Sequence, residues 1–322
     1  MNKRDRVLSI LDDGGTQDGT PAGFFIHFDP EYHRGQAAID KHLEFFRYTG
    51  MDFVKIQFEH PFPVRSEIER ARDWDKMPLY GADFYEAPLK VVEDLVRAAK
   101  QEALVIMTLY SPFMCAGQTV RHEQTVGHEV ITRQIHEDPA KVKKGIETIA
   151  ESLMLFVKGC IDLGIDGFYA STQGGESGRF ADPALFDTCI KPFDLVLMEE
   201  MNRACAFNIL HVCDFHAGYG DLTPFLDYPG HIVNCSLELG DERVSAKELS
   251  RLFGRPFMGG MDRKGALVSG SPVEIEEAVA AAMDDAPDRF ILGADCTLPS
   301  DIDWRRIRTA ISAAHVRRRA QE

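Results

Sequence analysis

The chain alternates between short, continuously apolar runs and longer segments in which apolar residues recur with helical spacing. A run without alternating polar positions is typical of a strand that is buried on both faces of a parallel sheet. The runs lie at residues 22–28, 53–58, 104–109, 166–170, 208–213, 231–235, 256–260 and 290–295. The pattern therefore predicts eight short parallel strands.

Amphipathic segments separate these runs and predict helices over residues 37–46, 89–99, 139–160, 183–202, 246–253, 273–283 and 304–311. Asp138 and Asp182 each precede a proline, which predicts an N-cap followed by proline at the first helical position. Ser271 with Glu274 predicts a capping box. Residues 115–136 have weak periodicity and predict no element.

Eight strands that alternate with helices predict an α/β fold of the (β/α)8 or TIM-barrel type, as a single domain over residues 1–322. An open doubly wound sheet is the alternative. It is less favoured because no glycine-rich phosphate-binding turn follows the first run.

Composition narrows the function classes. The chain is 44% hydrophobic and 27% charged, which is typical of a globular protein, and its formal net charge of -15 disfavours nucleic acid or an anionic membrane as a partner. No apolar run is long enough to span a bilayer. The 7 cysteines are odd in number and scattered, unlike a disulfide framework. We expect reduced thiols and a cytoplasmic location.

The strongest candidate site combines a histidine and two cysteines. His211 and Cys213 are two residues apart on one strand, so their side chains leave the backbone on the same side. Cys296 directly follows the last apolar run. One nitrogen and two sulfurs with an open fourth position are typical of catalytic zinc. Two alternatives stay open: these are buried core residues, or Cys235, at the end of the sixth run, is a fourth ligand.

Other candidates also follow predicted strands, where barrel enzymes place their active sites. His27 and Glu59 end the first two runs and are predicted to orient a substrate or move a proton. Asp214 is a candidate either to accept a hydrogen bond from His211 or to act as a surface cap. The candidates for substrate binding lie near the ends of later strands: Tyr169, Gln173, His216 and Asp262.

From residue 21 to about residue 315, the chain resembles the uroporphyrinogen decarboxylase superfamily, and within it the zinc-dependent methyltransferases of the methylcobamide:coenzyme M type. The motif that carries the resemblance is H-x-C followed much later by C, matched by His211, Cys213 and Cys296. The resemblance implies a (β/α)8 barrel and a Zn²⁺ ion held by these three residues. It also implies methyl transfer between a corrinoid on a separate protein and a small thiol, methyl ether or methylamine. Cobalamin-independent methionine synthase, a more distant relative, has a glutamate ligand where Cys235 stands here.

Two other functions remain as alternatives. A metal-free lyase of the decarboxylase type would need the arginine-rich segment that those enzymes carry after their first strand, whereas this chain has Ile26-His27-Phe28-Asp29-Pro30 there. Glu59 matches the acidic residue after their second strand and keeps this reading open. A non-catalytic accessory protein that binds zinc or a corrinoid is the third possibility.

Overall fold

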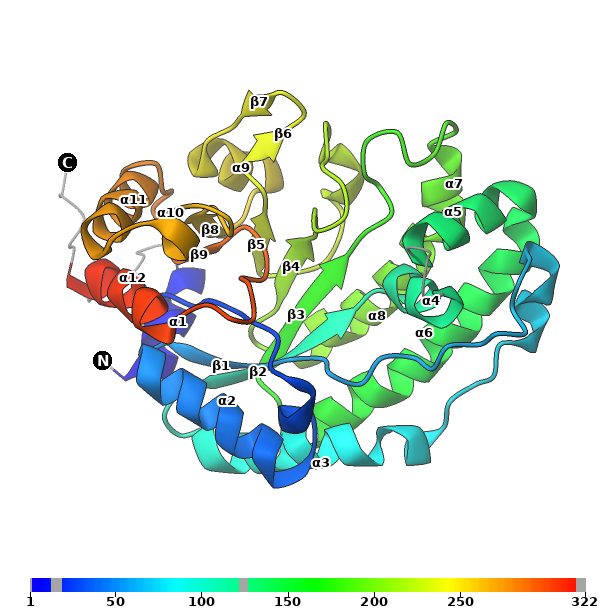
Figure 1. The fold of residues 1–322 in the computed structure, drawn as a ribbon, viewed down its shortest axis with the longest axis horizontal. Helices are drawn as coiled ribbons and strands as arrows, with labels where there is room; N and C mark the ends of the chain where they lie inside the picture. The colour runs from blue at the N-terminus through cyan, green and yellow to red at the C-terminus, as the bar shows by residue number, and fades with distance from the viewer. Residues whose placement is uncertain (1, 13–18, 122–126, 317–322) are drawn as a thin grey trace.

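The fold is built on a curled, wholly parallel sheet of seven strands (Figure 1). It is seen in a computed structural model, which describes residues 2–12, 19–121 and 127–316. The strands follow the order β1-β2-β3-β4-β5-β8-β9. Their bounds are Phe53–Ile56, Leu104–Tyr110, Gly167–Thr172, Ile209–Val212, Ile232–Cys235, Phe257–Met261 and Phe290–Ala294. Nearly all their residues are buried, as the continuous apolar runs predict. The α/β class and a barrel-like arrangement are therefore confirmed.

The predicted strand over residues 22–28 is not formed, and the sheet does not close into an eight-stranded barrel within the described ranges. This segment makes a single bridge, between Ala22 and Leu292 of β9. On its other side, the Asp52 amide donates to the Ala22 carbonyl at 3.0 Å, next to β1. The segment thus lies between the first and last strands, but only its start is paired.

The rest of the segment is diverted because other groups use its carbonyls. The Phe25 carbonyl accepts from the Leu298 amide at 2.8 Å, in the loop after β9. The Phe28 carbonyl accepts from the His33 ring at 2.7 Å. These bonds replace a strand ladder while the side chains stay buried. The segment is apolar because its side chains are buried, and a buried segment need not pair as a strand.

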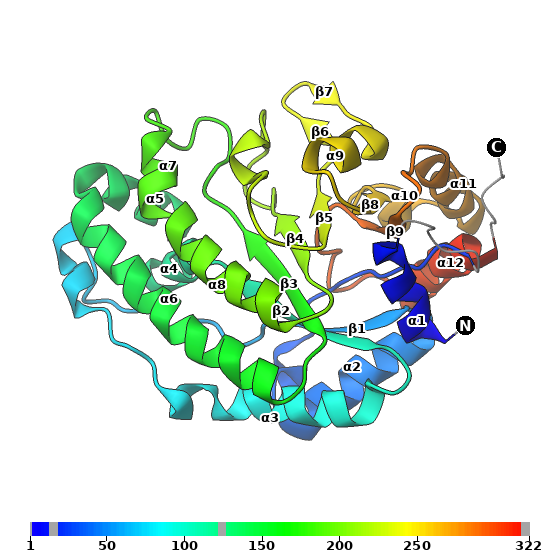
Figure 2. The ribbon, with the colours of Figure 1, turned by 180° about the vertical axis from the view of Figure 1, so that it is seen from behind.

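Helices lie along the outer side of the curled sheet (Figure 1, Figure 2). The helices α1 to α6 span Lys3–Leu8, Gly35–Thr49, Ala82–Ala99, Pro112–Val120, Gly127–Glu137 and Pro139–Asp162. The helices α7 to α12 span Ala184–Cys189, Lys191–Ala204, Ala246–Phe253, Ala266–Ser269, Pro272–Asp284 and Trp304–Val316. A short hairpin, β6 (Glu238–Leu239) and β7 (Glu242–Arg243), precedes α9. No helix in the described ranges is long and apolar enough to cross a membrane.

The predicted caps at Asp138 and Ser271 are formed, but the one at Asp182 is not, because α7 begins at Ala184 and its N-cap is Pro183. Asp138 accepts from the Lys141 amide at the start of α6, and Ser271 with Glu274 forms the capping box of α11. The predicted helix over 183–202 is broken at Ile190, whose φ of -120° and ψ of -64° separate α7 from α8. Pro192 follows this break and has no N–H to continue α7.

Candidate metal centre

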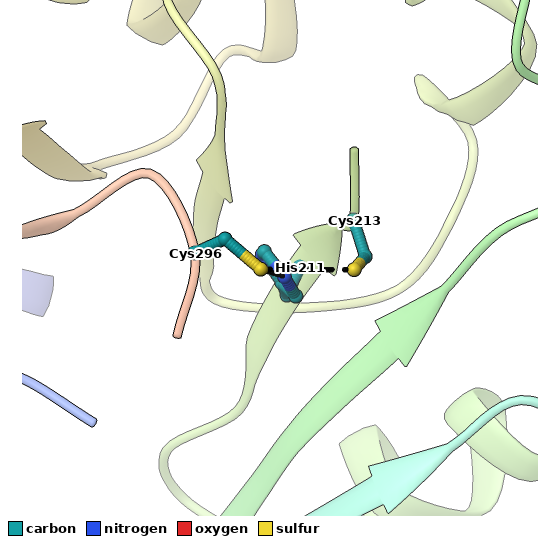
Figure 3. A group of neighbouring side chains, drawn as sticks. All are labelled: His211, Cys213 and Cys296. Carbon is teal, nitrogen blue, oxygen red and sulfur yellow. Dashed lines mark hydrogen bonds between the residues drawn. The ribbon is translucent and has the colours of Figure 1, made fainter. Parts of the chain in front are cut away.

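His211, Cys213 and Cys296 come together at the carboxyl ends of β4 and β9. Their ligand atoms all lie within 4.8 Å of one another. The Cys213 and Cys296 sulfurs are 3.8 Å apart, and the Cys296 sulfur is 3.5 Å from His211 Nε2. Figure 3 shows the three side chains pointing toward one another. All three are buried.

These separations fit one tetrahedral zinc ion. Zinc binds sulfur at about 2.3 Å and imidazole nitrogen at about 2.0–2.1 Å, so two tetrahedral sulfurs lie about 3.8 Å apart and a sulfur and a nitrogen about 3.5 Å apart. The Cys213–Cys296 and Cys296–His211 separations agree with these values, and the Cys213 sulfur lies within 4.8 Å of the imidazole. The donor set of one imidazole and two thiols suits Zn²⁺, and three protein ligands leave a fourth position for a substrate atom.

The strand register places His211 and directs Cys235 elsewhere. His211 is paired with Asn234 and Val212 with Cys235, and side chains alternate between the two faces of a sheet. Cys235 therefore points to the face opposite His211, and it is not part of the ligand group found among the described residues. The Tyr169 ring stacks on the His211 ring, with the ring centres 4.9 Å apart, and restricts the orientation of the imidazole.

The two cysteines share a hydrogen bond that polarises them. The hydrogen bond from Cys296 lowers the pKa of Cys213 although burial opposes this shift. The same bond and burial raise the pKa of Cys296 well above its usual range. Gln173 Nε2 also donates to the Cys213 sulfur, at 3.2 Å. A bound cation would favour loss of the protons from both thiols.

A cavity of about 510 Å³ opens onto the three ligands, and Gln173, His216 and Tyr169 line it as well. The Tyr169 hydroxyl is already engaged, since it donates to Asn234 Oδ1 at 2.6 Å, so a ligand would meet its ring. His216 lies 4.2 Å from the ring of His128, whose pKa burial lowers to about 3 with help from the charges of His216 and Arg179. Three predicted substrate-binding residues thus face one chamber.

His27 and Glu59 form a chain of hydrogen bonds with Tyr110 at the side of this cavity. His27 Nδ1 lies 2.9 Å from Glu59 Oε1, and the Tyr110 hydroxyl lies 3.1 Å from His27 Nε2. Burial would raise the pKa of Glu59, but the hydrogen bond and charge of His27 and the charge of His33 outweigh it and lower that pKa. Glu59 is therefore a carboxylate at neutral pH, and His27 is oriented by it. This chain can orient a group in the cavity or move a proton.

Asp262, a predicted substrate-binding residue, directly follows β8 but is not among the residues that line this cavity. Asp262 is exposed and lies in a separate pocket of about 190 Å³, where its carboxylate accepts from the Lys264 amide at 2.7 Å. Gly259 and Gly260, which have φ angles of 151° and 94°, lie within the paired part of β8, and the chain turns after Met261, where the Gly265 amide donates to the Asp262 carbonyl. In this turn the buried side chain is that of Arg263.

Asp214 does not accept a hydrogen bond from His211 in the described structure. Its carboxylate binds the Arg263 guanidinium at 2.7 Å, and His211 Nδ1 has no partner among the described residues. Arg263 also pairs with Asp295, whose carboxylate accepts from the Arg263 amide at 2.7 Å. Asp214 follows Cys213 and Asp295 precedes Cys296, so one arginine links the two segments that carry the cysteines.

Sequence reasoning missed Lys55, Tyr110 and Arg263. Lys55 had a detectable signal, because a lysine inside the apolar run 53–58 is unusual in a buried strand. Tyr110 directly follows the predicted third strand, where the carboxyl-end rule applies. Arg263 has no signal in the sequence, because its two partners are distant along the chain.

The barrel-like α/β sheet carries, at the carboxyl ends of its strands, a group of one imidazole and two thiols that could hold a metal ion. The chain belongs to the uroporphyrinogen decarboxylase family, whose model matches residues 50–317. Its fold is similar to that of a methyltransferase from Methanosarcina mazei, with a TM-score of 0.73 and 14% identity over 98% of both chains. A B12-independent methionine synthase from Shewanella sp. W3-18-1 is similar with a TM-score of 0.52 and 13% identity, over 93% of this chain and 95% of the other. No curated protein matches the chain.

Proposed function

We propose that this protein is a zinc-dependent methyltransferase. It moves a methyl group between a corrinoid carried by a partner protein and a small thiol, methyl ether or methylamine. The observation that carries the proposal is the ligand geometry of His211, Cys213 and Cys296 at the cavity. Family membership and the similarity of the fold to a methyltransferase support it.

The residues of the cavity have distinct tasks in this reaction. His211, Cys213 and Cys296 would hold the ion. Bound zinc would supply a Lewis acid that lowers the pKa of a thiol or polarises the heteroatom of a methyl donor. The chain of Tyr110, His27 and Glu59 accepts or returns the proton of the small substrate.

The corrinoid would reach the cavity from outside. Phe215 lines the cavity and is 60% exposed, so it offers an apolar contact to a flat macrocycle at the entrance. The loops that follow the strands at this end are the candidate docking surface for the corrinoid protein.

A metal-free decarboxylase is less well supported. Its polycarboxylate substrate would need several cations, and among the described residues that line the cavity only Lys55 and Arg121 are lysine or arginine. A zinc- or corrinoid-binding accessory protein would share the ligand geometry, but it would show no turnover.

The proposal is tested by supplying free cob(I)alamin with a panel of methylated thiols, ethers and amines. We expect one class of compound to produce methylcobalamin, which is measured by its absorbance. A chelator should abolish the reaction, and added zinc should restore it. Decarboxylation by the chelated protein would instead support the lyase. Stoichiometric binding of zinc or corrinoid without turnover would support the accessory protein.

Replacing Arg263 with methionine is expected to weaken zinc binding by about 10- to 100-fold, as is typical when a residue that supports metal ligands is removed. The reason is that Arg263 links Asp214 and Asp295, which adjoin the two cysteines. Competition with a chromogenic chelator measures the affinity.

The matched control is Arg243→Met, in the same pocket but exposed and paired only with Glu238 among the described residues. It should bind zinc as the native protein does. Equal zinc affinities for the Arg263 variant and the native protein would contradict a positioning role, whereas partial recovery in Arg263→Lys would support one.

A further inference from the structure

Gln173 is a buried amide directed at one of the two cysteine sulfurs. It directly follows β3, and its Nε2 donates to the Cys213 sulfur at 3.2 Å. The side chain is 0% exposed, and a hydrogen bond in such surroundings is electrostatically stronger than one in water. A thiolate only accepts hydrogen bonds, and Nε2 is the part of the amide that can donate to it. The contact therefore suits Cys213 in the deprotonated form that a metal ligand needs.

The backbone on both sides of Gln173 is held by hydrogen bonds. The Cys213 amide donates to the Thr172 carbonyl at 3.0 Å, which continues the β3–β4 pairing up to the two residues concerned. Beyond Gln173, Gly174 turns the chain with a φ of 110°, and its amide donates to Glu176 Oε2 at 2.9 Å. Gln173 is therefore held in place by its neighbours and needs no bound ligand to reach the sulfur.

The sulfur of Cys296 lacks a comparable donor. Among the described residues, its side-chain hydrogen-bond contacts are with the Cys213 sulfur at 3.8 Å and with His211 Nε2 at 3.5 Å. Both partners are proposed ligands, so each would direct a lone pair at a bound ion and would donate no proton to Cys296. The two sulfurs are thus similarly buried, at 4% and 3% exposed, but differently hydrogen-bonded.

We propose that Gln173 is a positioning residue that makes the two sulfurs unequal: it holds Cys213 and stabilises the negative charge on its sulfur, so that Cys296 is the more reactive thiolate. Hydrogen bonds to a charged group favour the charged form, and hydrogen bonds to ligand sulfurs tune a metal centre. A Cys213 sulfur stabilised in this way donates less charge to the ion, which leaves the ion a stronger Lewis acid toward its fourth ligand. This inference rests on the proposed function for the presence of the ion.

Alkylation of the zinc-saturated protein by iodoacetamide compares the two sulfurs directly. A sulfur–carbon bond forms as the carbon–iodine bond breaks, and iodide leaves with the electron pair. In the native protein we expect Cys296 to react about tenfold or more faster than Cys213, since hydrogen bonds to charged groups are the stronger ones. Mass spectrometry of the two cysteine peptides measures the initial rates.

Gln173→Met keeps a similar volume and removes the donor. The rate at Cys213 should rise about tenfold or more, while the rate at Cys296 changes little, because only Cys213 loses a hydrogen bond. The matched control is Gln118→Met, at a second glutamine of the cavity, whose amide oxygen accepts from the Phe62 amide at 3.2 Å. This control should leave both rates as they are in the native protein.

The absorption spectrum of the cobalt-loaded protein gives a second readout that involves no alkylation. Loss of a hydrogen bond raises the energy of the sulfur lone pair. The charge-transfer band from sulfur to cobalt should therefore move to longer wavelength in Gln173→Met and stay in place in Gln118→Met.

Equal rates for the two sulfurs in the native protein would overturn the proposal, and this comparison needs no variant. An unchanged Cys213 rate or an unchanged cobalt spectrum in Gln173→Met would overturn it as well. Equal acceleration at both sulfurs would show that the substitution only loosens the site, which also contradicts the proposal. If the native protein binds neither zinc nor cobalt, the proposed function fails together with this role. If metal binds and the sulfurs react alike, only the role of Gln173 fails.

Discussion

Cys296→Ala and Cys213→Ala are each expected to remove zinc and methyl transfer together. Two of the three proposed ligands would remain in each variant, and two ligands would not hold Zn²⁺ in a site proposed to bind it through three. We expect the affinity for zinc to fall by more than about 100-fold, beyond the loss typical of changes outside the ligand shell. Metal analysis of the purified protein and chelator competition measure the change.

Cys235→Ala is the matched control. Cys235 is as buried as the two ligand cysteines and lies at the end of β5, next to β4, but it points to the other face of the sheet. Its variant should keep zinc and activity. Zinc content that stays native in Cys296→Ala, or that falls equally in Cys235→Ala, would be incompatible with the proposed ligand set.

Glu59→Gln is expected to lower kcat by about 10²- to 10⁴-fold, the range typical of a lost acid or base partner. The glutamine keeps the size of the side chain but removes the carboxylate charge that orients His27. Tyr110→Phe, which removes the other end of the chain, should also lower kcat. Steady-state kinetics with the methyl donor found in the panel measure kcat and KM.

Zinc content provides the second readout for these variants, because neither Glu59 nor Tyr110 belongs to the ligand group. We expect native zinc content and a nearly unchanged KM. Glu44→Gln, at an exposed carboxylate of α2, is the control and should have native kcat. A native kcat in Glu59→Gln, or loss of zinc from it, would show that the chain does not handle a proton.

Much of the fold is predictable because burial and capping leave local signals. The seven paired strands all coincide with continuous apolar runs, and the Ser271 capping box marks the start of α11. Helix α4 was missed for a related reason. Eight of its nine residues are buried, so it has no polar face and no helical period in its sequence.

The site is less accessible to sequence reasoning, because its contacts join distant segments. The placement of His211 and Cys213 on one face follows from strand alternation, whereas the clamp of Arg263 on Asp214 and Asp295 depends on the backbone turn after β8. Asp262 was chosen instead because it is the first acidic residue after that strand. Chain position alone does not reveal which of two neighbouring side chains turns inward.

Residues 22–28 are the part of the barrel wall that is least constrained by strand pairing. The segment carries His27, and a hydrogen bond between Phe25 and Leu298 joins it to the loop that carries Cys296. Its later residues take no part in the ladder of the seven paired strands. Substitutions meant to admit bulkier methylated compounds are therefore best made in this segment. They can widen the cavity without changing the register of the seven paired strands.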